Sequence, residues 1–364
     1  MGWLMAYAVT NWFWRNPLFQ PLNDTQAWNT LGQLLSRRWS LTECRATVLS
    51  MVRECPDVIS LHLRPNRLFK GFTPGQHVAL TVPVNGVLKS RTFSLSQAPV
   101  ADGSLRLTIK VKADGQVSKA ASTLKRGDVV VLSQASGAFV HPRPERGVLL
   151  ISAGSGITPM MAMLQDWARQ DAPPDAVLLH SCRNEAEFLF KHELQTLVHY
   201  LPALKILPVF SAESGRLDAA RLRQLVPDFA LRDTLLCGPR PFMDWVSDFY
   251  AEQGLAGQLK QEHFQPRLTP IRPDAEHFTA FHTNGNAAFS ARSGQSLLEA
   301  AEADGLKPAH GCRRGICMTC QCKKLAGVVH NQLTNTPSGS GEEWIQLCVS
   351  TPVSDLYLEL ANHG

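Results

Sequence analysis

The pattern of apolar and polar positions changes twice along the chain, which divides it into modules. From residue 45 to residue 134, short alternating runs are separated by Pro and Gly turns, as is typical of antiparallel strands. The clearest runs are Val58–Leu63, His77–Val84, Leu105–Val111 and Val129–Leu132. They predict a small antiparallel β-barrel.

Beyond Pro142–Pro144 the alternation gives way to continuous apolar runs, each followed by a stretch of helical periodicity. These runs are Val148–Ile151, Ala176–Leu179, Leu204–Phe210 and Thr234–Leu236. Strands that are apolar on both faces and alternate with helices indicate βαβ units. The second module is therefore predicted to be an α/β domain with a parallel sheet.

The stretch Pro266–Pro273 contains three prolines and is typical of a linker. The remaining residues predict a hairpin, a helix over Ser296–Asp304 and a loop rich in cysteine. We therefore divide the chain into an extension (1–40), a barrel domain (41–143), an α/β domain (144–265), a linker (266–277) and a C-terminal domain (278–364).

Composition limits the choice of compartment and partner. The 36 Lys and Arg against 31 Asp and Glu give a net charge of only +5, so we expect no nucleic-acid partner. The chain has nine cysteines, and four of them crowd between positions 312 and 322, which favours a reduced, cytoplasmic setting over a disulfide framework. The aromatic stretch Trp3–Trp14 is too short to cross a bilayer, because Arg15 interrupts it. We interpret it as an arm docked on the protein, with a foot at the membrane interface as the alternative.

The strongest chemical signal is Cys312-x4-Cys317-x2-Cys320, with Cys348 further along the chain. This spacing is that of a plant-type [2Fe–2S] cluster, in which one loop supplies three thiolates and a distant segment supplies the fourth. Glycines 311 and 315 permit close backbone approach and N–H bonds to sulfur. Zinc is the alternative, but structural zinc usually takes paired C-x2-C knuckles. We interpret the fifth thiol, Cys322, as a packed strand residue.

Two turns of the α/β domain predict a nucleotide crevice. In Gly154-Ser155-Gly156-Ile157-Thr158-Pro159 a strand runs through glycines into a helix, where a pyrophosphate can approach backbone N–H groups. This turn lacks the third glycine of the dinucleotide fingerprint, so a plain strand-to-helix turn is the alternative. Cys237-Gly238-Pro239 ends another buried strand. Carboxyl ends of parallel strands meet at the ligand crevice, so Cys237 is predicted to line the nicotinamide pocket, with a small core residue as the alternative.

The barrel contains a second pair of candidate elements. Alternation along Arg91-Thr92-Phe93-Ser94 puts Arg91 and Phe93 on one face of a strand and Ser94 on the other. Downstream, Gly115 and Ser118 open a helix whose first N–H groups could hold a phosphate.

Together these residues resemble the ferredoxin–NADP reductase superfamily followed by a plant-type ferredoxin domain, over about residues 41–364. The resemblance implies an FAD-binding antiparallel barrel, an NAD(P)-binding α/β domain and an α+β ferredoxin domain of the β-grasp type. The family's flavin motif falls on Arg91, Phe93 and Ser94. By resemblance the aromatic ring packs on the isoalloxazine, Ser94 reaches toward flavin N5, and Arg91 meets the phosphates.

Further roles follow from the same resemblance. Ser94 and Cys237 are the implied catalytic residues. The ending Glu262-His263-Phe264 resembles the family's E-x-F and places Phe264 near the flavin. The remaining residues implied to contact the flavin or the nucleotide are Gly115, Ser118, Gly154, Gly156, Thr158, Pro159, Gly238 and Pro239.

A nicotinamide delivers two electrons as hydride, an iron–sulfur cluster accepts one, and a flavin bridges the two. The sequence thus predicts an NAD(P)H-dependent reductase with FAD and a [2Fe–2S] cluster. By resemblance its acceptor is a fatty-acyl desaturase, which can be membrane-bound, so a peripheral position on the inner membrane face accompanies the cytoplasmic prediction. The alternatives are the reductase of an aromatic-ring or acyl-CoA oxygenase, some of which use FMN, and a redox-sensing iron–sulfur protein.

Two charge patterns concern specificity. Ser181, Arg183 and Lys191 follow the second strand of the α/β domain, where a 2′-phosphate would lie, and favour NADPH, whereas Glu185 and Glu187 argue for NADH. The alternative is that Arg183 only packs against the adenine. Five residues near the cluster loop predict a basic rim that steers an acidic acceptor: His310, Arg313, Arg314, Lys323 and Lys324. The alternative is that part of this charge is a solvated surface with no role.

Overall fold

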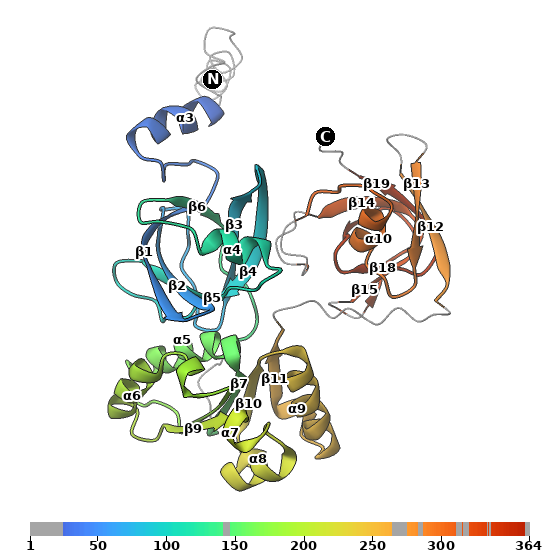
Figure 1. Cartoon of the computed structure of the whole chain (residues 1–364). Helices are drawn as coiled ribbons and strands as arrows, with labels where there is room; N and C mark the ends of the chain where they lie inside the picture. The colour runs from blue at the N-terminus through green and yellow to red at the C-terminus, as the bar shows by residue number, and fades with distance from the viewer. Residues whose placement is uncertain are drawn as a thin grey trace, which may run out of the picture.

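The computed structural model describes residues 25–140, 146–263, 275–282, 287–310, 315, 320–332, 334 and 336–360. Within these residues the chain forms a barrel, a parallel sheet and a C-terminal module, in the order that the hydrophobic pattern predicts (Figure 1). The predicted fold class is confirmed. The aromatic arm, Trp3–Trp14, lies outside the described residues.

The barrel is a six-stranded antiparallel sheet in the order β4-β3-β6-β1-β2-β5. An isolated bridge between Leu95 and Leu107 joins the two edge strands and closes it. Alternate side chains such as Val78 and Leu80 are fully buried, as a sheet with one face on a core requires. The strands are β1 (Arg45–Cys55), β2 (Val58–Pro65), β3 (His77–Val84), β4 (Val87–Ser94), β5 (Leu105–Lys110) and β6 (Val129–Leu132).

Two helices accompany the barrel. The short α4 (Gln116–Ala121) buries Val117 and Ala121 in the barrel core. Ahead of the barrel, α3 (Thr25–Leu35) is a helix that the sequence did not predict. Gly32 makes room for Trp39 against this helix, because a Cβ at position 32 would lie 2.0 Å from the indole.

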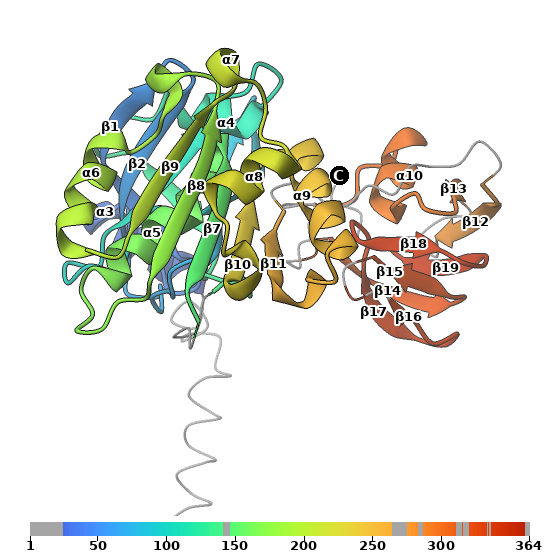
Figure 2. The same ribbon diagram turned by 90° about the horizontal axis from the view of Figure 1, so that it is seen from below.

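The α/β domain has five parallel strands in the order β11-β10-β7-β8-β9, seen side by side in Figure 2. The strands are β7 (Val148–Ala153), β8 (Ala176–Cys182), β9 (Lys205–Phe210), β10 (Asp233–Cys237) and β11 (Leu259–Glu262). The helices are α5 (Ile157–Trp167), α6 (Lys191–Tyr200), α7 (Ser211–Ser214), α8 (Ala219–Leu225) and α9 (Arg240–Glu252). Short 3-10 turns cover Gly154–Gly156, Glu185–Glu187, Phe229–Leu231 and Ala256–Gln258.

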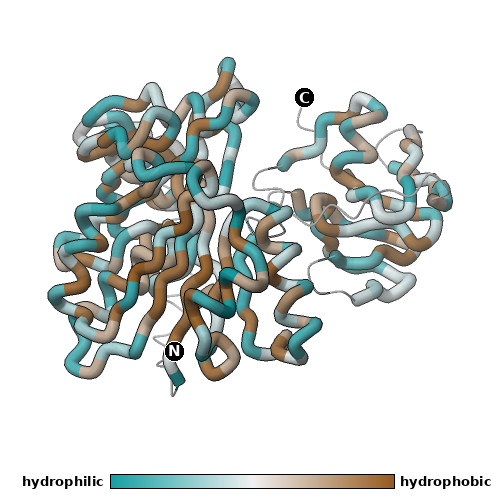
Figure 3. Tube along the Cα trace, turned by 60° about the horizontal axis from the view of Figure 1, so that its bottom comes forward, coloured by the Kyte–Doolittle hydropathy of each residue, from teal (hydrophilic) through white to brown (hydrophobic). Residues whose placement is uncertain are grey.

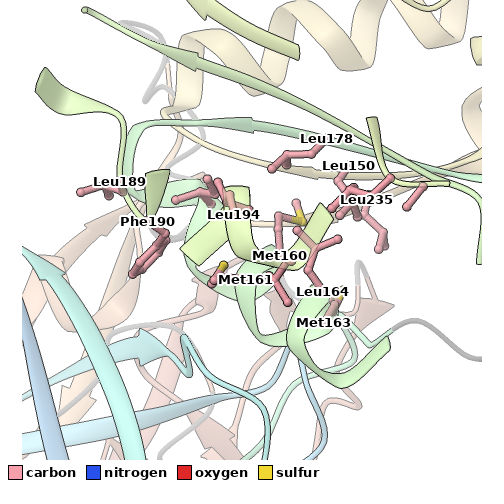
Figure 4. Close-up of a cluster of buried hydrophobic side chains, with 14 of the residues drawn as sticks. Leu150, Met160, Met161, Met163, Leu164, Leu178, Leu189, Phe190, Leu194 and Leu235 are labelled. Atoms are coloured by element: carbon pink, nitrogen blue, oxygen red, sulfur yellow. The ribbon is translucent and has the colours of Figure 1, made fainter. Parts of the chain in front are cut away.

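Each face of this sheet carries its own apolar core. Residues of α5 and α6, including Met160 and Leu194, pack with Leu150 and Leu178 on one face (Figure 4). Residues of α8 and α9 pack on the other face. Hydrophobic segments run through the middle of the larger of the two bodies (Figure 3). Continuous apolar strands are therefore explained by helices on both sides.

The C-terminal module packs α10 (Leu297–Ala303) on a five-stranded sheet in the order β13-β12-β19-β14-β17, with a three-stranded sheet β16-β15-β18 beside it. Ser296 caps the helix by accepting from the N–H of Glu299, so the predicted helix is confirmed. The strands are β12 (His277–His282), β13 (Ala287–Arg292), β14 (Gln321–Ala326), β15 (Val329–Asn331), β16 (Thr336–Pro337), β17 (Glu343–Gln346), β18 (Ser350–Pro352) and β19 (Leu356–Glu359).

Across the described part of the chain, no helix combines the length and apolarity needed to cross a membrane.

Candidate functional site

A row of polar residues crosses the parallel sheet near the carboxyl ends of its strands. Cys237 is paired in register with Glu262 on one side and with Ser152 on the other, and Ser152 is paired with His180. Partners in register project to the same face of a sheet. All four are buried, so the row forms a polar edge to the apolar core beneath α5.

The two glycine turns meet at this row. Gly154 has φ of +53°, a left-handed conformation that favours glycine. A Cβ on Gly156 would lie 2.1 Å from the carbonyl oxygen of Cys237, so only glycine lets the turns approach this closely. Gly238 in turn faces Ala153. The nucleotide turn and the Cys-Gly-Pro turn thus form one surface at the strand ends.

Next to this surface the row contains a neutral histidine. His180 Nδ1 lies 2.9 Å from the Ser152 hydroxyl, and its ring stacks on Phe188 with centroids 5.4 Å apart. Its Nε2 has no hydrogen-bond partner among the described residues. Burial lowers the pKa of His180 to about 3, so the imidazole is uncharged at neutral pH.

The flavin-motif strand β4 has the predicted alternation. Phe93 pairs with Val78 and Arg91 with Leu80, so both face the side on which the barrel core lies. Ser94 pairs with His77 and faces the other side. The strand therefore presents the arginine and the aromatic ring on one surface and the serine on another.

Ser94 belongs to a buried chain of hydrogen bonds that joins the barrel to the α/β domain. Its hydroxyl donates to Glu262 Oε2 at 3.0 Å, and Glu262 Oε1 lies 2.9 Å from His77 Nδ1. The side chains of His77 and Glu262 are only 6% and 4% exposed. Because Glu262 pairs with Cys237, the chain connects Ser94 to the predicted nicotinamide edge. Sequence reasoning missed His77, which only its place at a strand start after Pro74-Gly75 could have suggested.

At the predicted flavin-phosphate turn, the hydroxyl of Ser118 bonds to the backbone of its own turn. Its hydroxyl donates to the Gly115 carbonyl at 3.2 Å and accepts from the N–H of Lys112 at 3.3 Å. The nearby cation Lys89, on the same face of β4 as Arg91, donates to Gln116 at 2.5 Å. The positive side chain of Lys89 therefore lies beside the start of α4, where the sequence predicts a phosphate site.

The other predicted nucleotide residues occupy different positions. Thr158 donates to the Ser155 carbonyl at 2.9 Å, and Pro159 is buried in the first turn of α5. Arg183 is exposed directly after β8, while Lys191 pairs with Glu185 at 2.6 Å. Phe264 lies outside the described residues.

Two of the four predicted cluster ligands, Cys312 and Cys317, also lie outside the described residues. The structure brings the other two together: the N–H of Leu347 donates to the Cys320 carbonyl at 3.0 Å, which puts Cys348 beside Cys320. The N–H of Gly315 donates to Cys348 Sγ at 3.2 Å, the kind of bond that stabilises a thiolate. These residues fit an iron–sulfur cluster held by a loop and a distant cysteine.

Cys322 is buried in the core of this module, and burial, followed by the charge of Cys320, raises the pKa of its thiol to about 12. Its prediction as a packed residue is confirmed.

The prediction that Lys324 belongs to an exposed basic rim is wrong. Lys324 is fully buried, and its ammonium donates to the carbonyls of Gly339 and Gly341. Lys323 pairs with Glu342 at 2.7 Å, and Arg313 and Arg314 lie outside the described residues.

This architecture defines a class: an oxidoreductase in which a flavin barrel, a nucleotide domain and an iron–sulfur module follow one another. Three family models match in that order. They describe an oxidoreductase FAD-binding domain (residues 45–141), an oxidoreductase NAD-binding domain (150–248) and a 2Fe-2S iron-sulfur cluster binding domain (281–353). The chain belongs to the ferredoxin–NADP reductase superfamily, among its members with a C-terminal [2Fe–2S] domain.

Similar proteins share this layout. An NADPH oxidoreductase of Mycobacterium tuberculosis is 32% identical, over 88% of this chain and 86% of its own length. A glycine betaine monooxygenase reductase subunit of Chromohalobacter salexigens is 28% identical, over 91% of this chain and 99% of its own. The solved structure of phthalate dioxygenase reductase has the same fold, with a TM-score of 0.60 at 21% identity, covering 88% of this chain and 98% of that one.

Proposed function

We propose that this protein is the reductase component that carries electrons from NAD(P)H, through FAD and a [2Fe–2S] cluster, to a partner non-haem iron enzyme. When bound, FAD accepts a hydride and releases its electrons singly, as a one-electron cluster requires. The observation that carries the proposal is the Ser94–Glu262–His77 chain, which joins the flavin strand to the strand edge with Cys237. It fixes the two halves of a hydride-transfer site against each other.

The chain's own residues divide the work. Phe93 offers a ring for the flavin to pack on, Arg91 and the backbone at Gly115 hold its phosphates, and Ser94, held by its bond to Glu262, lies toward N5. Cys237 shapes the nicotinamide pocket together with the turn formed by Gly238 and Pro239. Gly154, Gly156, Thr158 and Pro159 form the turn that receives the nucleotide phosphates. In this assignment residues 41–143 bind FAD, 144–265 bind the nucleotide, and 278–364 carry the cluster.

The cluster is the exit for electrons. Cys320 and Cys348 supply two thiolates, and we assign Cys312 and Cys317 as the others. Support comes from the burial of both described cysteines and from the N–H of Gly315 on Cys348 Sγ. Hydrogen bonds to the sulfur ligands and exposure to solvent help to set the reduction potential of such a cluster, so the N–H of Gly315 would contribute to it.

The acceptor is the finer part of the proposal. A relative named as a monooxygenase reductase subunit supports an oxygenase component as the partner. A fatty-acyl desaturase, which the sequence favoured, accepts single electrons from the same kind of donor. The oxygenase component and the desaturase are therefore both candidate acceptors to be tested.

Anaerobic stopped-flow reduction tests the proposal. With NADPH or NADH we expect the flavin to bleach first and the cluster afterwards, and one of these candidate acceptors to reoxidise the cluster. Cys348→Ser should keep flavin reduction and lose transfer to that acceptor. Cluster absorbance that stays oxidised while the flavin is fully reduced would favour the redox-sensor alternative. Zinc in place of iron in the isolated protein would remove the cluster from the route.

A further inference from the structure

Arg106 on β5 is an arginine buried between the barrel and the α/β domain, with a side chain 7% exposed. Its Nε and Nη2 donate to the carbonyl of Ser96, at 3.2 and 2.6 Å. Its Nη1 donates to Glu193 Oε1 at 2.6 Å, and its guanidinium carbon lies 4.7 Å from the centre of the Phe190 ring. Phe190 and Glu193 lie at the start of α6, so one side chain connects the two domains.

The barrel side of this contact is a segment directly after the flavin motif. Ser96 follows Ser94 by two residues, and its N–H donates back to the Arg106 carbonyl at 2.9 Å. Its hydroxyl lies 2.7 Å from that of Thr108. Ser96 is thus fixed from several directions, and Ser94, two residues earlier at the end of β4, has little freedom to move without it.

The α/β side of the contact leads to the nucleotide turn. Glu193 Oε2 accepts from Gln165 Nε2 at 2.9 Å, and Gln165 Oε1 accepts from the N–H of Ala98 at 3.0 Å. Gln165 is on α5, the helix that starts after Gly156. The segment 94–98 is therefore tied both to α6 and to the helix that carries the nucleotide turn.

A buried arginine is an expensive way to join two domains, because its charge loses water unless every donor is satisfied. What it adds over apolar packing is direction: the planar guanidinium fixes the angle at which partners meet. An apolar contact would let the domains slide. Hydride transfer is sensitive to such sliding, since a misplacement of about 1 Å can cost on the order of a hundredfold in rate.

We propose that Arg106 is a positioning residue for hydride transfer. It holds the segment after the flavin motif against α6 and α5, and so fixes the distance between the flavin strand and the nicotinamide pocket. The inference rests on the NAD(P)H-to-flavin step of the proposed function and is independent of the acceptor, so flavin bleaching alone tests it.

Arg106→Met removes the guanidinium and keeps most of the side chain's length. In FAD-loaded protein we expect the limiting rate of flavin reduction by NADPH to fall about tenfold, because the two domains lose their fixed angle. The apparent Kd for NADPH should stay within about twofold, since no nucleotide contact is removed. The flavin midpoint potential and the rate of its reduction by dithionite should not change. Arg64→Met, which removes an exposed arginine from the neighbouring strand, is the matched control.

Two further variants keep the proposal open to refutation. Glu193→Gln leaves a half-exposed, hydrogen-bonding side chain and should slow flavin reduction about threefold, as loss of one charge-assisted bond predicts. If Arg106→Met does not retain FAD, an unchanged limiting rate in Glu193→Gln overturns the proposal. An unchanged rate in FAD-loaded Arg106→Met overturns it as well. Full activity in Arg106→Lys would also overturn it, because the positioning is argued from the geometry of the guanidinium and not from its charge alone. A shifted flavin potential in Arg106→Met would overturn it too, because the slower rate would then come from the flavin itself.

Discussion

Removing the carboxylate of Glu262 should loosen the junction between the two domains of the reductase. Glu262 accepts from Ser94 and contacts His77 in surroundings that exclude water. Hydrogen bonds to a charged group contribute about 1.5–3 kcal/mol each, so Glu262→Ala should cost roughly 3–6 kcal/mol. Glu262→Gln keeps the shape and can make two neutral bonds of about 1 kcal/mol each, so its cost should be roughly 1–4 kcal/mol and lower than that of Ala.

The measurement is urea unfolding of the FAD-loaded protein, followed by the rise in flavin fluorescence as FAD is released. With a denaturant slope of about 3 kcal/mol per M, the Ala variant should release FAD at a midpoint about 1–2 M lower. Glu252→Ala, at an exposed position of α9, should change the midpoint by less than about 0.2 M. A Glu262→Ala midpoint equal to that of Glu252→Ala would refute the reasoning.

A double-mutant cycle separates the two contacts of Glu262. If His77 and Glu262 interact directly, the cost of losing both should differ from the sum of the single costs by about 0.5–3 kcal/mol. The cycle with Ser94→Ala measures the other bond in the same way. Additive costs for both pairs would mean that Glu262 stabilises the junction only by filling space.

Three other predictions follow from single residues. Gly156→Ala puts a Cβ 2.1 Å from the Cys237 carbonyl oxygen, so the turn must move and NADPH should bind about tenfold more weakly. A Cβ at Gly257 meets nothing within 4 Å, so Gly257→Ala should bind NADPH normally. Arg183→Ala should lower kcat/KM for NADPH about tenfold more than for NADH if Arg183 holds the 2′-phosphate, and equal losses would contradict this. The pKa of His180 is about 3 in the folded protein and 6.5 ordinarily. Below pH 6.5 the unfolded chain therefore binds a proton that the folded chain does not, so the free energy of unfolding falls as the pH falls. Between pH 6.5 and about 5 the loss should be about 2 kcal/mol, and His180→Gln, which keeps a partner for Ser152, should flatten it; an equally steep fall in the variant would contradict the assignment.

Much of the fold could be predicted because its strands have short local signatures. The alternating run His77–Val84 predicts a strand, and the structure gives β3 the same bounds. The apolar run after Gly147 is continuous because helices cover both faces of β7. The helix α3 was missed although Asn23 and Asp24 precede it as a start signal. Three of its apolar residues, Trp28, Leu31 and Leu34, stay exposed, so its hydrophobic pattern does not mark a core-facing helix.

The site was predictable where glycine or cysteine spacing carries the chemistry and unpredictable where tertiary contacts do. Gly156 could be placed at the crevice because a strand and a helix flank it in sequence. His77 and Glu262 are 185 residues apart, and no local pattern announces that they meet. The same holds for Arg106 and Glu193, which are 87 residues apart.

Lys323 and Lys324 show why a run of like charges is a poor guide to a docking face. Neighbouring residues of a strand point to opposite sides of the sheet, so at most one of the two can belong to a given surface. Lys323 pairs with Glu342, and Lys324 is buried and donates to two loop carbonyls, which ties the loop at residues 339–341 to β14. Its charge thus serves the module's own fold. Of the five residues of the predicted rim, this leaves His310, Arg313 and Arg314 as the candidates for steering an acceptor. Charge reversal at both arginines should slow electron delivery to that acceptor severalfold at low ionic strength and leave flavin reduction by NAD(P)H unchanged, whereas Lys323→Glu should change neither. An equal loss in Lys323→Glu would assign the steering to charge spread over the strand.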